Sequence, residues 1–203
     1  MESIENHIEK INILQAYEQV PSSNLKEILS NLQTKELMVI ATELNFNYET
    51  VDKNFLINES FKIIQDKDRI ENSMLLVREN ELKIFNELLQ KDNIQNNYLS
   101  FLYTGYLLGR HIIFSFYSDG KIYFLIPDEI KESYRKIDNS VFLKKYQRYK
   151  KINQYLTISL NLYGALKKKK FVEIFNHYNE EKLNQKEFKE ILYDILSRQQ
   201  PFF

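Results

Sequence analysis

The stretch YLSFLYTGYLLGRHIIFSFYSDGKIYFLIPDEI, residues 98–130, carries the clearest strand signal of the sequence. Within it, residues 111–117 and 121–126 are rich in aromatic and β-branched side chains, which suit the half-buried surface of a sheet. Asp119 and Gly120 stand between these two runs, and this pair tolerates the positive φ angles of a tight turn. The stretch therefore predicts a β-hairpin.

A predicted helix lies on each side of this hairpin. Gly109 follows two leucines at the point where a helix would end on a left-handed residue, and we expect it to be that residue. Pro127 cannot donate a ladder hydrogen bond and favours a first helical turn, so the second strand should pass into a helix there. The order of helix, hairpin and helix resembles winged-helix domains, which implies that the hairpin can reach a nucleic-acid groove.

The composition indicates a soluble, mostly helical protein. Hydrophobic residues make up 43% of the 203 residues, and only four Gly and three Pro interrupt them, so connections should be short. The absence of cysteine excludes disulfides, thiolate metal sites and cysteine nucleophiles. The acidic N-terminus has no apolar run, and no stretch approaches the roughly 18 apolar residues of a membrane span. We expect a cytoplasmic protein without membrane contact.

Charge is distributed unevenly along the chain, although the formal net charge is zero. Residues 1–100 carry 10 basic and 17 acidic side chains, whereas residues 101–203 carry 18 and 11. The excess lies between Lys131 and Lys170, with 12 basic residues against Glu132 and Asp138. This asymmetry indicates either an anionic partner for the second half or an electrostatic match between the two halves.

Helical spacing of apolar residues over the rest of the chain predicts a mainly α, multi-helical fold with one small β-hairpin in a winged-helix-like middle module. The first helix should be capped by Ser3, and its expected buried stripe consists of Ile4, Ile8, Ile11, Leu14 and Tyr17. The predicted helices span residues 3–20, 25–32, 34–44, 55–64, 68–77, 80–91, 98–109, 128–137, 140–163, 167–178 and 184–195.

Polar residues 93–97 offer the best candidate for a domain boundary, because Asn and Asp side chains compete with helical hydrogen bonds. We therefore expect three modules. The first is a helical module over residues 1–93, the second is the helix and hairpin over 94–139, and the third is a helical module over 140–203.

Part of the first module resembles a known family. Leu32-x-x-x-Glu36-Leu37-x-x-Ile40-Ala41-x-x-Leu44, an extended link, and Lys53-x-x-Leu56-Ile57-x-x-Ser60-Phe61 are similar to the helix–extended loop–helix of SAP-like and Rho N-terminal-like domains. The resemblance covers roughly 40 residues. It implies a small helical module of a kind that binds nucleic acid.

The second half resembles the C-terminal half of uncharacterised bacterial proteins that also begin with a SAP-like module. The residues that carry this resemblance are Leu162-Tyr163-Gly164, Phe171-x-x-Ile174-Phe175-Asn176-x-Tyr178 and Glu187-Phe188. Many of those relatives add a cysteine-rich zinc tail, which this sequence does not contain. The resemblance implies no established activity.

Basic residues of the second half are the most suggestive functional feature. Ammonium and guanidinium groups on one helix face can neutralise phosphates, and the interleaved Tyr134, Tyr146 and Tyr149 could stack on bases. The same pattern also suits a solvated face whose lysine stems cover apolar surface, with the tyrosines in the core. The candidate binding residues are Arg110, Lys121, Lys131, Arg135, Lys136, Lys144, Lys145, Arg148 and Lys151.

Catalytic chemistry has no comparable support. His7, His111 and His177 are far apart in the sequence and match no metal-binding spacing. No phosphate-cradling glycine motif is present either, and Gly105 with Gly109 suits close helix packing instead. We expect no cofactor, no metal site and no enzymatic activity.

Two functions remain as expectations. The first is a small non-enzymatic nucleic-acid-binding or regulatory protein that uses its basic second half to contact DNA or RNA. The second is a protein–protein interaction or inhibitor module whose basic face docks an acidic protein surface. The 14 Tyr and 14 Phe residues could also cover the interface of a homo-oligomer.

Overall fold

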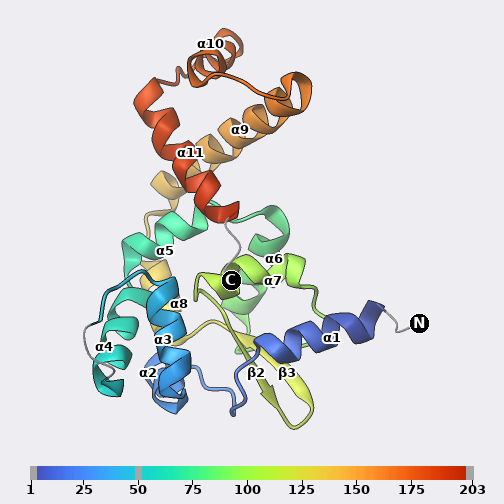
Figure 1. The fold of residues 1–203 in the computed structure, drawn as a ribbon, viewed down its shortest axis with the longest axis vertical. Coiled ribbons are helices and arrows are strands. Elements are labelled where there is room, and N and C mark those ends of the chain that lie inside the picture. The colour runs from blue at the N-terminus through green and yellow to red at the C-terminus, as the bar shows by residue number, and fades with distance from the viewer. Residues whose placement is uncertain (1–3, 49–51, 200–203) are drawn as a thin grey trace. The chain divides into compact units, whose positions relative to one another are not determined.

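The computed structural model describes residues 4–48 and 52–199, over which the chain forms eleven helices and three short strands (Figure 1). The predicted mainly α fold with one small hairpin is confirmed. Two compact units are present. The first comprises the chain up to Ser73 together with Val77–Ile137, and the second comprises Met74–Leu76 and the chain from Asp138 onward.

The expected division after residue 93 falls inside the first unit, whereas the expected division after residue 139 lies near the observed one. The elements of the first unit are α1 (Ile4–Gln15), α2 (Leu25–Asn31), α3 (Thr34–Glu43), α4 (Lys53–Ile64), α5 (Lys67–Met74), α6 (Glu79–Gln90), β1 (Ile94–Gln95), α7 (Phe101–Gly109), β2 (Phe114–Ser118), β3 (Lys121–Leu125) and α8 (Asp128–Arg135). The second unit contains α9 (Asn139–Tyr163), α10 (Lys168–Tyr178) and α11 (Gln185–Gln199).

The predicted hairpin is formed by β2 and β3, which pair antiparallel from Phe114 opposite Leu125 to Ser118 opposite Lys121. Asp119 and Gly120 both have positive φ, at 50° and 74°, as a two-residue hairpin turn of this hand requires. The sheet has a third strand, β1, which pairs antiparallel with β3, so the strand order is β1-β3-β2.

The polar stretch expected to separate two modules is part of this sheet, so that expectation was wrong. The side chain of Asn97 continues the ladder beyond β1, because its Oδ1 accepts a hydrogen bond from the backbone N–H of Ile122 at 2.9 Å. Its Nδ2 donates to the carbonyl of Gly120 at 3.1 Å and to Glu9 Oε1 at 2.7 Å. A polar residue can therefore extend a sheet when its amide takes the place of a backbone group.

Helix α1 ends at Gln15, five residues earlier than predicted. The chain then joins the sheet, where the N–H of Tyr17 donates to the carbonyl of Ser115 and the N–H of Tyr117 donates to the carbonyl of Tyr17, each at 2.9 Å. Tyr17 thus forms a parallel bridge to Phe116 rather than part of a helical stripe. The bridge satisfies backbone groups at the edge of β2 that would otherwise lack partners.

The expected apolar stripe of α1 is wrong at Ile4 and Leu14, which are exposed. Leu14 is 85% exposed, whereas Asn12 is only 3% exposed. The Nδ2 of Asn12 donates to the carbonyls of Asn97 and Leu99, both at 2.9 Å, so this helix is anchored by a buried amide. The expected cap Ser3 lies outside the described residues.

Helices α3 and α4 occupy the positions where the SAP-like pattern was found, with buried Leu37, Ile40 and Leu56 on their inner faces. Helix α2, which precedes them, is tied to α8. Glu129 Oε2 accepts from the backbone N–H of Leu25 at 3.0 Å, and Asp128 Oδ2 accepts from Ser23 Oγ at 2.7 Å. The first unit therefore joins both predicted N-terminal modules into one body.

The end of α7 differs from the prediction. Gly109 is helical, and it is His111 that takes the positive φ, at 50°. A non-glycine residue in this region carries strain that its surroundings must offset. The imidazole of His111 is buried, and its contacts are described below.

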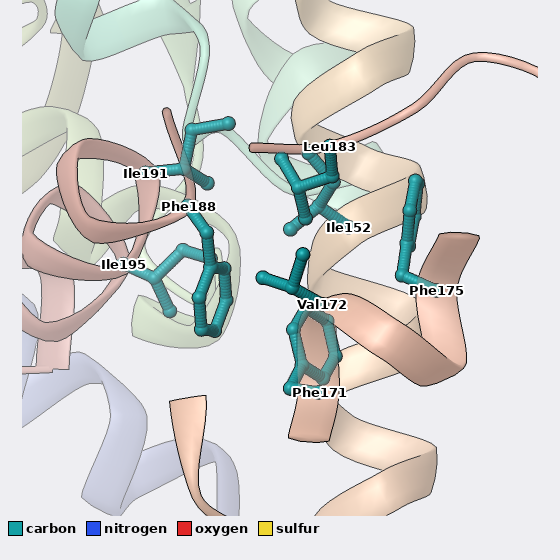
Figure 2. Packing of buried hydrophobic residues seen from close by; sticks show 8 residues of the cluster. All are labelled: Ile152, Phe171, Val172, Phe175, Leu183, Phe188, Ile191 and Ile195. Carbon is teal, nitrogen blue, oxygen red and sulfur yellow. The ribbon is translucent and has the colours of Figure 1, made fainter. Parts of the chain in front are cut away.

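The second unit has its own apolar core, formed by α9, α10 and α11 (Figure 2). Phe171 and Phe188 stack within it with ring centroids 4.4 Å apart. Near the C-terminal end of α9, Leu160 and Tyr163 are exposed, whereas Ile152 in the middle of the helix is fully buried. The buried members of the core are Ile152, Phe171, Val172, Phe175, Leu183, Phe188, Ile191 and Ile195.

Candidate nucleic-acid interface

The nine basic residues singled out in the sequence are divided between the two compact units. The four of the second unit lie along α9, and two of those in the first unit, Lys131 and Arg135, lie on α8. Those of the first unit are Arg110, Lys121, Lys131, Arg135 and Lys136, and those of the second unit are Lys144, Lys145, Arg148 and Lys151.

Three of the residues in the first unit lie on its surface, with Lys121 exposed at the start of β3 and Arg135 and Lys136 exposed at the end of α8. Lys131 is different, because it is only 8% exposed and its Nζ donates to the carbonyl of Lys91 at 3.4 Å. Lys131 faces inward from α8, so its inclusion in a surface site was wrong.

Arg110 belongs to a half-buried cluster at the end of α7. Its guanidinium lies over the ring of Tyr106, 5.5 Å from the centroid, and its backbone carbonyl accepts from Arg69 Nη2 at 2.6 Å. Burial and the neighbouring Arg110 lower the pKa of Arg69 to about 10. Arg110 therefore helps to build the interior of the first unit.

Arg148 holds the second unit together. Its Nε and Nη2 meet the two carboxylate oxygens of Glu187 at 2.9 and 3.2 Å, which is the bidentate geometry that favours an Arg–carboxylate pair. Nη1 and Nη2 also donate to the carbonyls of Glu181 and Lys182 at 3.1 and 2.9 Å. The Arg148 side chain is 16% exposed, so it was wrongly assigned to an open binding face.

The three lysines that remain on α9 are exposed. Lys144 and Lys151 are seven residues apart and so lie on the same side of the helix, two turns from each other. Ile158 and Leu162 continue this side toward the C-terminal end of α9, and both are exposed. One face of α9 is therefore basic in its first half and apolar in its second.

The tyrosines expected to alternate with these cations are committed to packing. Tyr134 meets Phe85 edge-on at 4.8 Å, and Tyr146 stacks on Phe142 at 6.0 Å. The hydroxyl of Tyr149 donates to Asp194 Oδ2 at 2.9 Å, and burial together with this contact raises the pKa of Tyr149. Of the two interpretations of the tyrosines, the packing one is correct.

A second set of exposed cations lies at the start of α10, outside the nine predicted residues. Lys167 precedes the helix, Lys168, Lys169 and Lys170 open it, and all four are exposed. Lys170 Nζ lies 3.4 Å from Glu173 Oε2 one turn further on. The run of four lysines in the sequence was the signal for this surface.

The first unit also contains a buried polar cluster whose members are far apart in the sequence. His111 Nε2 lies 2.9 Å from Glu43 Oε2 on α3. Burial lowers the pKa of His111, Glu43 opposes that shift, and Arg69 and Arg110 add to it. Burial, followed by Glu43 and Glu36, also raises the pKa of Tyr17.

These groups come from α3, α5, the end of α7 and the segment after α1, so only the fold brings them together. The remaining histidines, His7 and His177, are exposed on α1 and α10. Within the described ranges, no group of three or more acidic or His side chains is placed to hold a metal ion. The described helices also include none with the length and apolarity that crossing a bilayer demands.

No family model, curated protein or solved structure matches the chain. The SAP-like and winged-helix-like interpretations therefore stand on the residues and on the layout of α3, α4 and the hairpin.

Proposed function

We propose that the protein is a small non-enzymatic nucleic-acid-binding or regulatory protein whose C-terminal unit contacts the phosphate backbone. The observation that carries this proposal is that the two compact units differ in the sign of their net charge. From Asp138 onward the chain has 13 basic and 7 acidic residues, whereas the residues before it have 15 and 21. When one unit is basic and the other is acidic, a polyanion is attracted to the basic unit.

The proposed contact surface consists of Lys144 and Lys151 on α9 and the lysines at the start of α10. Lysine binds phosphate as a mobile point charge and does not read base edges in the bidentate way that arginine does. Binding should therefore depend little on sequence and strongly on salt. With about four phosphate contacts, affinity should fall about 100-fold between ~50 and ~200 mM salt.

The test is fluorescence anisotropy of labelled DNA and RNA in a salt series, with a charge-reversal variant in which Lys144, Lys151, Lys168 and Lys169 become Glu. Lys131 and Arg148 are left intact because their loss would disturb packing. The matched control reverses four exposed lysines of the first unit, Lys26, Lys35, Lys62 and Lys83.

The proposal predicts loss of binding in the first variant and retention in the control, with circular dichroism unchanged in both. Absence of binding at ~50 mM salt would refute it. Equal loss in both variants would also refute it, because net charge alone would then explain the attraction.

A second candidate function, docking of an acidic protein surface, is favoured by the exposed Ile158 and Leu162 beyond the α9 lysines. A partner helix whose contacting face is acidic in one half and apolar in the other would match this face in charge and polarity. Such binding should weaken when Ile158 and Leu162 become Ser, and it should depend less on salt than phosphate binding does.

We further infer that residues 32–61 form a SAP-like module and that α7, the hairpin and α8 form a winged-helix-like one. The layout of α3 and α4 and the two positive φ angles of the hairpin turn support this assignment. A cytoplasmic location is part of the same proposal, because a cysteine-free chain suits a reducing compartment without requiring it.

A further inference from the structure

The last turn of α9 extends past the core of its unit. Leu156 is the last apolar residue of α9 that packs against the apolar cluster, and Ser159, one turn later, is still buried. Beyond it, Leu162 is 71% exposed and Tyr163 is 61% exposed. A phenol ring and an isobutyl group held in water cost free energy that contact with a ligand would recover.

The turn from α9 to α10 is held in place by several contacts. Gly164, with φ 69° and ψ −52°, donates its N–H to the carbonyl of Leu160 at 2.8 Å. Ala165 donates its N–H to the carbonyl of Tyr163 at 2.8 Å, which closes a γ-turn of the rare positive-φ form. Leu166 then packs against the apolar cluster and anchors the chain.

The same turn is open on its outer side. Among the described residues other than Gly164 and its two chain neighbours, no heavy atom lies within 4 Å of the position that a Cβ on Gly164 would take. The exposed lysines 167–170 follow directly, and the N–H of Phe171 donates to the carbonyl of Lys167 at 3.0 Å to begin α10. An exposed aromatic ring on a backbone turn held by hydrogen bonds therefore stands four residues before four exposed cations.

We propose that this corner, residues 162–170, binds single-stranded nucleic acid, with the Tyr163 ring stacked on an unpaired base and the lysines contacting the flanking phosphates. The inference builds on the proposed phosphate contact and adds the type of strand. A duplex presents phosphates but hides its base faces, whereas a single strand presents both. Tyr163 can reach a base because it is 61% exposed, whereas Tyr146 and Tyr149, earlier in α9, pack within the unit.

The chain contains no tryptophan, so Tyr163→Trp introduces a single fluorescent reporter at the corner. We would titrate this variant with single-stranded oligonucleotides and with a duplex of the same sequence, at ~50 mM salt. Tyr98→Trp, at an exposed position in the first unit, is the matched control. In parallel, anisotropy would compare the affinities of the Tyr163→Ala and Tyr163→Phe variants.

The proposal predicts quenching of the Tyr163→Trp reporter by single strands but not by the duplex, and no quenching of the control. Tyr163→Ala should weaken single-strand binding about 5- to 100-fold, and Tyr163→Phe should retain it, because the ring is what stacks. Salt-sensitive binding of single strand and duplex with equal affinity and no quenching would overturn this inference while leaving the phosphate contact intact. If neither polymer binds, the proposed function and this inference both fail.

Discussion

Replacing Asn12 by Leu tests whether a buried amide, rather than an apolar stripe, fastens α1 to the first unit. Leucine has the same number of side-chain heavy atoms and the same branching as asparagine, and the substitution removes the donor to the carbonyls of Asn97 and Leu99. The bond to the Leu99 carbonyl is buried and the bond to the Asn97 carbonyl is partly buried, and a buried carbonyl left without a partner costs about 1–3 kcal/mol. Burying a leucine side chain returns up to about 2 kcal/mol. We expect a net loss of about 2 kcal/mol in the free energy of unfolding.

The assay combines urea unfolding with hydrogen exchange read by mass spectrometry on peptides. Peptide resolution is needed because two compact units do not have to unfold together. A loss of 2 kcal/mol corresponds to roughly 30-fold faster exchange through opening of the first unit. Peptides from the sheet, residues 94–125, should show it, and peptides from residues 171–195 should not.

The control is Leu14→Ser, which should change stability by less than about 0.5 kcal/mol because Leu14 is exposed. If Leu14→Ser proves more damaging than Asn12→Leu, α1 is held by its apolar residues, and the reasoning from the buried amide is wrong.

Three further predictions concern other parts of the chain. Arg148→Met should destabilise the second unit by about 2 kcal/mol, because Glu187 loses its bidentate partner, whereas Lys144→Met should be nearly neutral in the same urea titration. His111 has a pKa below its ordinary value, so the neutral form is favoured in the folded state. The stability of the first unit should therefore fall as the pH drops below about 6.5, and urea midpoints at several pH values should show a flatter slope for His111→Gln. A steeper slope for that variant would contradict the assignment. Gly164→Ala should lower the stability of the second unit by about 1–3 kcal/mol, because an L-residue is strained at φ 69°, and thermal unfolding that leaves the midpoint unchanged would refute the γ-turn argument.

Local chemistry explains what could be predicted from the sequence. The Asp119-Gly120 turn, the start of α8 after Pro127 and the end of α9 at Gly164 each depend on residues within a few positions of one another. Such features follow from backbone preferences that a short window already contains. The hairpin and most helices were therefore predictable.

The features that were missed depend on distant partners. Glycine is the residue type that most often ends a helix in the left-handed conformation, so Gly109 was the expected position. His111 takes the positive φ instead, and its imidazole contacts Glu43, which lies 68 positions earlier in the chain. β1 is recognisable only through its pairing with β3 and through the Asn97 side chain. These contacts join residues too far apart to fall within one short stretch of sequence. From its neighbours alone, Asn97 therefore looks like part of a break between two modules.

The same limit applies to the candidate interface. The sequence showed that α9 is rich in cations, and Lys144 and Lys151 do lie on its surface. It could not show that Arg148 meets Glu187, 39 positions later, or that Lys131 points inward. A basic residue in a helix is available to a ligand only if no carboxylate or carbonyl of the fold has already bound it.

The hydrogen bonds from α8 to the start of α2 bear on how the protein folds during synthesis. Leu25 and Ser23 depend on Glu129 and Asp128, more than a hundred positions later, and Tyr17 depends on β2. A nascent chain therefore cannot complete the first unit until roughly residue 130 has left the ribosome. Until then, the N-terminal helices lack their partners, and their unpaired surfaces can bind chaperones or other nascent chains. The N-terminal helices should consequently fail to fold as an excised fragment ending at residue 93.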